Sequence, residues 1–106
     1  MVIRSWTYQT AAHNATRFEE FEYEYGLPMM NGQRGCLEVK FYRRCPEESN
    51  TEIAEYSMIS KWASWELLQA ALDSKSWCDE VALFLSQNFG EGNGVIKHYD
   101  NIELKC

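Results

Sequence analysis

The order in which two apolar periodicities follow one another along the chain constrains its fold more than any other feature. Strand side chains point alternately to two faces, whereas the apolar side of a helix recurs every three or four residues. Alternation occurs in four segments, at residues 2–8, 35–44, 52–62 and 95–104. Helical spacing fills the stretches that follow the first and the third of these segments. The predicted element order is therefore β-α-β-β-α-α-β.

The first helical stretch has an apolar side and an acidic side. Thr10 is expected to be its N-cap, and the apolar side chains that recur at helical spacing are Ala11, Ala15, Phe18, Phe21 and Tyr25. The glutamates fall on or beside the opposite side, which predicts a solvated face made of Glu19, Glu20, Glu22 and Glu24. Gly26 and Pro28 are expected to end or distort this helix, because proline has no backbone N–H to donate.

The second helical stretch divides into two helices. Ser64 is expected to cap the first, with Glu66 in its first turn, and the side chains predicted to face inward are Leu67, Leu68, Ala71 and Leu72. Ser76 and Asp79 resemble a capping box for the second helix, whose predicted buried side chains are Trp77, Val81, Phe84 and Leu85. Gly90 is expected to stop that helix, and the glycine-rich residues 90–94 are expected to form a mobile turn.

The two middle strands each predict an inward and an outward face. In residues 35–44 one face carries Leu37, Val39 and Phe41, and the other carries Cys36, Glu38, Lys40 and Tyr42. In residues 52–62 the apolar face carries Ala54, Tyr56, Met58 and Trp62. The polar loop between them, residues 45–50, favours an antiparallel hairpin.

Four strands with helices after the first and the third match the ferredoxin-like arrangement, an α+β fold with a four-stranded antiparallel sheet. A length of 106 residues suits one such domain over residues 1–106. Because the helices would cover only one face of the sheet, apolar side chains on the other face would meet water. A second copy packed sheet to sheet about a two-fold axis would cover them, so we expect a homodimer.

The charge balance argues against nucleic-acid and membrane partners. Ten Lys and Arg residues against 16 Asp and Glu residues give a formal net charge of −6, which repels phosphate groups. The N-terminus has no basic segment before a long apolar run, and no stretch approaches the ~18 apolar residues of a membrane span. The cysteines form no C-x-x-C pair and are Cys36, Cys45, Cys78 and Cys106. Together these features predict a cytoplasmic protein with reduced thiols.

The sequence offers little for a metal ion, a phosphate group or a serine nucleophile. Its two histidines, His13 and His98, have no second ligand at zinc-like spacing. Gly90, Gly92 and Gly94 follow a helix rather than open one, so they do not predict a phosphate-binding loop. No Gly-x-Ser-x-Gly elbow occurs. A metal site is therefore not expected.

Five short motifs occur in a characteristic order: VIRSW at 2–6, EYGLP at 24–28, YRR at 42–44, SKWASWE at 60–66 and IKHYD at 96–100. In that order and spacing they resemble the antibiotic-biosynthesis-monooxygenase-like (ABM-like) family of the dimeric α/β-barrel superfamily. The resemblance covers nearly the whole chain. It implies a ferredoxin-like fold and a homodimer, in agreement with the periodicity.

The resemblance implies more than one chemistry, because this fold hosts unrelated activities. Some members oxidise polycyclic aromatic substrates with molecular oxygen and no prosthetic group, others degrade haem, and many have no known reaction. The haem-degrading branch pairs a first-strand asparagine with a tryptophan and, ten residues later, a histidine. This chain has Ala71 and Val81 at the latter two positions and no asparagine in its first strand. The resemblance therefore favours chemistry without a cofactor.

His98 and Tyr56 are the candidate catalytic residues, and Arg4, Trp6 and Trp62 are the candidate substrate-binding residues. His98 could act as a general base or hydrogen-bond donor, and Tyr56 could accept or relay a proton. The two tryptophans would wall a cavity between sheet and helices, and Arg4 could stabilise negative charge. Each residue also has a structural alternative: a histidine bonded across the sheet or at a dimer contact, tryptophans filling the core, and an arginine paired with a carboxylate.

Two functions remain open at this point. A cofactor-independent monooxygenase would deprotonate a small aromatic or quinone-like compound, and the anion would react directly with oxygen. A non-catalytic binding or stress-response protein would hold a small hydrophobic molecule in the same pocket. A cavity with converging polar groups favours catalysis, whereas a wholly apolar or collapsed cavity favours a binding or structural role.

Overall fold

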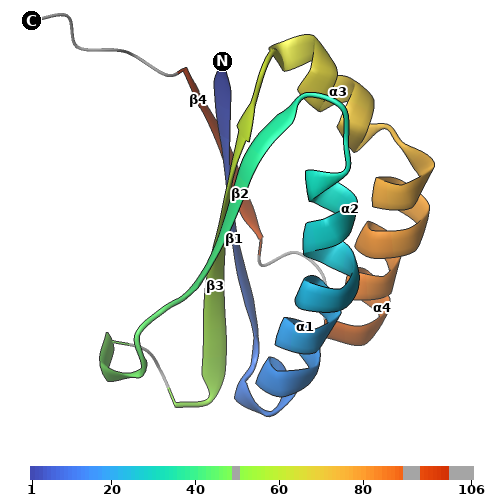
Figure 1. Ribbon diagram of the computed structural model, residues 1–106. Helices are drawn as coiled ribbons and strands as arrows, with labels where there is room; N and C mark the ends of the chain where they lie inside the picture. Colours follow the sequence, from blue (N-terminus) through green and yellow to red (C-terminus); the bar gives the residue numbers. More distant parts are fainter. Residues whose placement is uncertain (49–50, 90–93, 101–106) are drawn as a thin grey trace, which may run out of the picture.

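The computed structural model describes residues 1–48, 51–89 and 94–100, which form an antiparallel sheet with helices on one face (Figure 1). The strands are β1 (Val2–Ala11), β2 (Cys36–Arg43), β3 (Ile53–Trp62) and β4 (Val95–Asp100). Their order across the sheet is β2-β3-β1-β4, and every neighbouring pair is antiparallel. The predicted ferredoxin-like β-α-β-β-α-α-β arrangement is confirmed.

The helical layer consists of two runs that lie side by side in opposite directions (Figure 1). The first run follows β1 and contains the 3-10 turn η1 (Ala12–Asn14), α1 (Ala15–Phe21), the π-helical segment η2 (Glu22–Gly26) and α2 (Leu27–Asn31). The second run follows β3 and contains α3 (Trp65–Leu72), the π-helical segment η4 (Ser76–Ala82) and α4 (Leu83–Phe89). A further 3-10 turn, η3 (Pro46–Glu48), lies between β2 and β3.

The first helical run begins later than predicted. Thr10 pairs with Ala54 in the ladder between β1 and β3, and the strand continues to Ala11. The prediction of Thr10 as an N-cap is therefore wrong, because cross-strand pairing holds its backbone in the sheet. Gly26 and Pro28 distort the run without ending it. The Leu27 N–H donates to the carbonyl of Glu22, five residues earlier, and the chain stays helical to Asn31.

In the second helical run, one of the two predicted N-caps is confirmed and the other is wrong. The Ser64 hydroxyl accepts a hydrogen bond from the Leu67 N–H at 3.2 Å, as predicted. At the next helix it is Ser74, and not Ser76, whose hydroxyl accepts from the Trp77 N–H, at 3.3 Å. The Ser76 prediction is wrong because helical backbone already begins at Lys75. The predicted stop at Gly90, residues 90–93 of the predicted turn and residues 101–104 of the predicted last strand lie outside the described residues.

The middle strands confirm one predicted face and correct the other. In β3 the side chains of Ala54, Tyr56, Met58 and Trp62 are buried, as predicted. In β2 the register shifts between Cys36 and Glu38. The extra residue of this bulge, Leu37, is exposed, and Cys36 packs against the core in its place. The predicted face of Leu37, Val39 and Phe41 is therefore correct only for its last two residues.

The core lies between the sheet and the helices in two clusters. One is centred on Phe18, Tyr56 and Phe89, and the other on Met58, Trp62 and Leu68. Burial of Trp77, Val81 and Leu85 is confirmed. Phe84 was predicted to be buried and is 38% exposed instead; it stacks on Phe21 at a centroid distance of 4.3 Å, where both rings line a hollow between the two helical runs.

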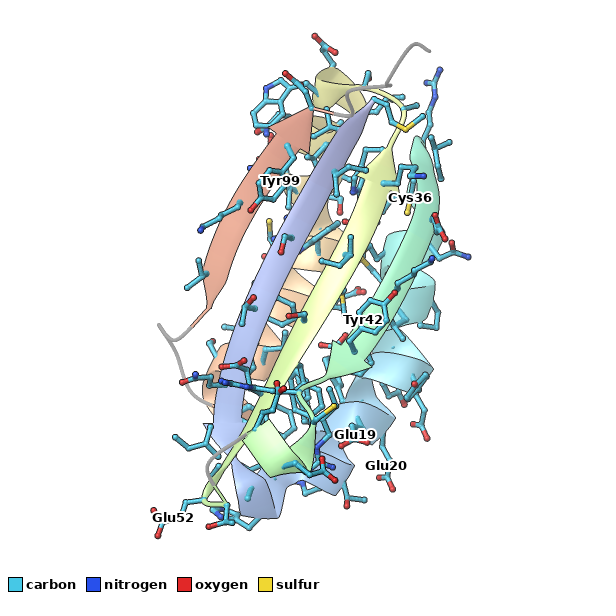
Figure 2. The ribbon with its side chains drawn as sticks, turned by 90° about the vertical axis from the view of Figure 1, so that its left-hand side faces the viewer. Glu19, Glu20, Cys36, Tyr42, Glu52 and Tyr99 are labelled. Atoms are coloured by element: carbon cyan, nitrogen blue, oxygen red, sulfur yellow. The ribbon has the colours of Figure 1, made fainter. Side chains whose placement is uncertain are left out.

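The opposite face of the sheet carries no described helix, as Figure 2 shows from that side. Tyr42 of β2 and Tyr99 of β4 lie on it near opposite edges of the sheet, and both are about half exposed. We call this surface the open face. Among the described helices, none is long and apolar enough to cross a membrane.

Candidate functional site

A cavity of about 230 Å³ lies between the sheet and the two helical runs. Its walls are mostly apolar and come from β1, β3, β4 and both runs: Trp6, Met29, Met30, Met58, Trp77, Val81, Ala82, Leu85 and Ile96. The remaining lining residues are Arg4, Glu22 and Gly26. We call this hollow the inner cavity. Its charged groups are the guanidinium of Arg4 and the carboxylate of Glu22.

Glu22 contributes the carboxylate and is 1% exposed. Its Oε1 atom is buried and has no hydrogen-bond partner among the described residues. Burial raises the pKa of this carboxyl from 4.5 to about 7. The prediction that Glu22 belongs to a solvated face is wrong. It follows the buried Phe18 by four residues and precedes the buried Met30 by eight, so it lies on the inward side of the helical run.

Gly26 provides the space that the carboxylate of Glu22 occupies. A β-carbon built on Gly26 would collide with the Oε2 atom of Glu22 and would lie 2.9 Å from its carboxyl carbon. The backbone of Gly26 is ordinary right-handed helix, so space rather than conformational freedom favours glycine here. Both residues belong to η2, and π-helical turns are frequent at functional sites.

Arg4 contributes the guanidinium from the inward side of β1 and is 6% exposed. Its Nε atom is buried without a hydrogen-bond partner among the described residues. The guanidinium carbon lies 5.2 Å from the ring centroid of Trp77, a cation–π contact. Burial lowers the pKa of Arg4 from 12.5 to about 10, so the group is still positively charged at neutral pH.

The inner cavity therefore holds two charged groups whose polar atoms are incompletely satisfied. No ion pair joins Arg4 to Glu22 among the contacts of the described residues. Burying such groups without partners is costly, and the cost would fall if a ligand supplied an acceptor to Arg4 and a donor to Glu22. Burial and the negative charge of Glu22 also raise the pKa of the neighbouring Tyr8.

Of the five residues selected from the sequence, Arg4 and Trp6 line the inner cavity. Trp62 does not: it is fully buried, its indole N–H donates to the Ser60 hydroxyl at 2.9 Å, and its ring lies 6.0 Å from that of Trp77. Trp62 thus packs against Trp77, which lines the inner cavity.

Tyr56 and His98 lie apart from the inner cavity. The Tyr56 hydroxyl donates to the Glu19 carboxylate at 2.6 Å. The pKa of Tyr56 lies well above its usual value. Burial is the largest cause, and this hydrogen bond is the second. His98 pairs with Arg4 in the β1–β4 ladder, but its exposed ring meets Trp65 edge to face at 5.1 Å. Partial burial, with the charge of Arg4 as the second cause, lowers the pKa of His98.

Reasoning from the sequence missed Glu22, although a signal was present. The residues Ala15, Phe18, Glu22, Gly26 and Met30 follow one another at spacings of three or four, and all five are buried. A carboxylate on such a stripe, four residues before a glycine, marks an inward-facing charge with space beside it.

The fold is similar to that of several solved structures. A candidate antibiotic biosynthesis monooxygenase from Deinococcus radiodurans matches with a TM-score of 0.76 and 15% identity, over 100% of this chain and 97% of that one. A candidate antibiotic biosynthesis monooxygenase from Nitrosomonas europaea matches with a TM-score of 0.76 and 7% identity, over 97% of this chain and 100% of that one. A conserved protein from Methanosarcina mazei Go1 has a TM-score of 0.72 and 20% identity, over 93% of this chain and 91% of that one.

These comparisons confirm the resemblance at the level of the fold: the chain has the ABM fold over its full length. The identities are too low to carry an activity from one protein to another. No protein-family model and no curated protein sequence matches the chain.

Proposed function

We propose that the protein is a cofactor-independent monooxygenase that acts on a small aromatic or quinone-like compound in the inner cavity. The observation that carries the proposal is the pair of incompletely satisfied groups, Arg4 and Glu22, in an otherwise apolar cavity. Converging polar groups in such a cavity are what a catalytic site needs and a simple apolar binding site does not.

Each group has a chemical role that its surroundings support. With a pKa of about 7, Glu22 is partly ionised near neutral pH and is basic enough to accept a proton from an acidic C–H or O–H. Arg4 holds a permanent positive charge where an oxyanion would form. Trp6 and Trp77 provide flat walls for a planar ring.

The reaction balances with oxygen as the only oxidant. Glu22 removes one proton from a ring CH₂ group, as in an anthrone or the keto tautomer of a quinol, and Arg4 stabilises the negative charge that is delocalised onto the substrate oxygen. The anion reduces O₂, one oxygen atom stays on carbon as a new C=O group, and the other leaves as water with both hydrogens. The sum is R₂CH₂ + O₂ → R₂C=O + H₂O.

Oxygen consumption over a panel of quinols and anthrones tests this proposal. Glu22→Gln should lower turnover by about 10²–10⁴-fold, the usual effect of losing a general base. Glu20→Gln removes the same charge from an exposed position of the same helix and should have no effect. Equal uptake by the wild type and Glu22→Gln would refute Glu22 as the base. No uptake across the panel would favour the alternative, a non-catalytic binding protein.

His98 and Tyr56 stay as predictions from the sequence, and the same assay compares them with Glu22. If His98→Ala loses turnover while Glu22→Gln keeps it, the base is His98. Tyr56→Phe would retain the ring in the core and remove only the hydroxyl that donates to Glu19.

We also propose that the protein forms a homodimer through the open face. The open face carries large apolar side chains that meet water in one copy, among them Tyr42, Val95 and Tyr99. A second copy packed on this face would cover them. Sedimentation at micromolar concentration should give the mass of a dimer, and a monomer would contradict the proposed packing.

We place this assembly in the cytoplasm, with reduced thiols. Among the described residues, Cys36, Cys45 and Cys78 are free, which is compatible with a reducing compartment. Cell fractionation would test this location.

A further inference from the structure

A second and larger hollow lies between the two helical runs, with a volume of about 680 Å³. We call it the outer groove. Three aromatic side chains line it: Phe21, Tyr25 and Phe84. Phe21 stacks on Phe84 at 4.3 Å and lies 5.8 Å from Tyr25, measured between ring centroids. A volume of this order, lined in part by aromatic rings, is typical of sites that bind small molecules.

The outer groove and the inner cavity share two wall residues, Met29 and Val81. Met29 comes from α2 in the first helical run and Val81 from η4 in the second, so the shared wall is where the two runs meet. A methionine side chain is unbranched and adapts its shape easily. Met29 is therefore the more adaptable of the two shared wall residues.

The side chain of Gln33 makes two polar contacts at this wall. The Gln33 side-chain amide donates to the Met29 sulfur at 3.5 Å and to the Ser76 hydroxyl at 3.2 Å. It links the end of the first run to the beginning of η4. Both contacts involve neutral groups and are individually weak, so the wall can open at small cost.

The charges of the outer groove are all of one sign. Glu24 and Glu80 line it, and none of its described lining residues is Lys, Arg or His. At about 7 Å in bulk water, one like charge weakens the binding of an anion by about threefold, and two by about sevenfold. The net charge of −6 acts in the same direction. An uncharged aromatic compound meets no such penalty, and a cationic one is attracted.

We propose that the outer groove is the entrance to the inner cavity, and that it admits uncharged or cationic aromatic compounds and excludes anions. This inference rests on the proposed function and narrows its substrate class. The compound enters protonated, loses its proton to Glu22, and only then carries the negative charge that Arg4 stabilises. At about 230 Å³ the inner cavity lies below the range of about 300–1,000 Å³ that is typical of pockets for drug-sized ligands, so it suits a small compound.

The charge selection is tested with three naphthalene probes that differ only in one substituent: 2-naphthol, 2-naphthoate and 2-naphthylmethylammonium. Binding is followed through the change in tryptophan fluorescence, because Trp6 and Trp77 line the inner cavity. The naphthol and the ammonium compound should associate several-fold faster than the naphthoate, because the two glutamates repel an anion at the entrance. The double variant Glu24→Gln/Glu80→Gln should reduce this ratio several-fold, whereas the matched control Glu20→Gln should leave it unchanged.

The entrance is tested by stopped-flow association of 2-naphthol with two variants of opposite effect. Met29→Ala should raise the association rate constant and Met29→Trp should lower it, each by about tenfold. The inference would be overturned by unchanged rate constants in both variants, by association of naphthoate as fast as that of 2-naphthol, or by failure of both other probes to bind. If the Met29 variants behave as expected but no compound is oxidised, the entrance stands and the proposed function fails. If Glu22-dependent turnover occurs without any effect of Met29, the proposed function stands and the entrance fails.

Discussion

Replacing Glu22 with glutamine should change how the stability of the protein depends on pH. Burial raises the pKa of Glu22 from 4.5 to about 7, which means that folding disfavours the ionised carboxylate. Below pH 4.5 the group is protonated in both the folded and the unfolded state and costs nothing. As the pH rises from 4.5 to about 7, the unfolded state ionises first and the folded state loses stability relative to it; above about 7 the folded state ionises too and the loss levels off.

The magnitude follows from the difference between the two pKa values. A rise from 4.5 to about 7 spans about 2.5 pH units, which corresponds to about 3 kcal/mol of stability lost between pH 4 and pH 8. Glutamine has nearly the shape of glutamate and does not titrate. Relative to the wild type, Glu22→Gln should therefore become more stable as the pH rises, by up to about 3 kcal/mol.

Urea unfolding of both proteins at intervals from pH 4 to pH 8 measures this effect directly. Glu20→Gln serves as the control, because Glu20 is exposed on the same helix and its removal should leave the pH profile of the wild type unchanged. Parallel profiles for the wild type and Glu22→Gln would refute the reasoning, because they would mean that Glu22 titrates near its ordinary pKa.

Three further predictions follow from named contacts. Gly26→Ala should displace the carboxylate of Glu22, cost about 1–3 kcal/mol as overpacking does, and flatten the pH profile of stability; a retained profile would mean that the carboxylate stays in place. Trp77→Ala should destabilise the protein by roughly 3–5 kcal/mol in urea unfolding, and a loss below about 1 kcal/mol would contradict its buried position against Trp62 and Arg4. Titration with hemin should give no stoichiometric Soret shift, because Ala71 and Val81 offer no ligand to iron; saturable, histidine-dependent binding would overturn this.

The fold could be predicted because its signals are local. The alternation of Ala54, Tyr56 and Met58 determines which face of β3 is buried, and the Ser64 cap sets the beginning of α3. The predictions that failed depend on contacts between distant segments. Pairing with Ala54 keeps Thr10 in the sheet, and the β2 bulge that exposes Leu37 is visible only once β3 lies beside it.

The candidate site was predictable in part. Arg4 and Trp6 share the inward face of a strand whose alternation is plain in the sequence, and both line the inner cavity. Glu22 was missed because it was grouped with neighbouring glutamates by residue type instead of by position on the helix. Glutamate is rarely buried, so its residue type alone predicts an exposed side chain. The spacing of Phe18, Glu22 and Gly26 predicts the opposite, an inward-facing one.

Both π-helical segments contribute lining residues to the inner cavity. Glu22 and Gly26 of η2 and Trp77, Val81 and Ala82 of η4 all line the inner cavity. A π-helical turn departs from the regular spacing of the α-helix and occurs mostly where function requires it. Two such segments in separate helical runs, both lining one cavity, are difficult to explain by packing alone. Because the ABM fold hosts unrelated chemistries, this local departure from regular helix, together with Arg4 and Glu22, is what distinguishes the chain as a candidate enzyme.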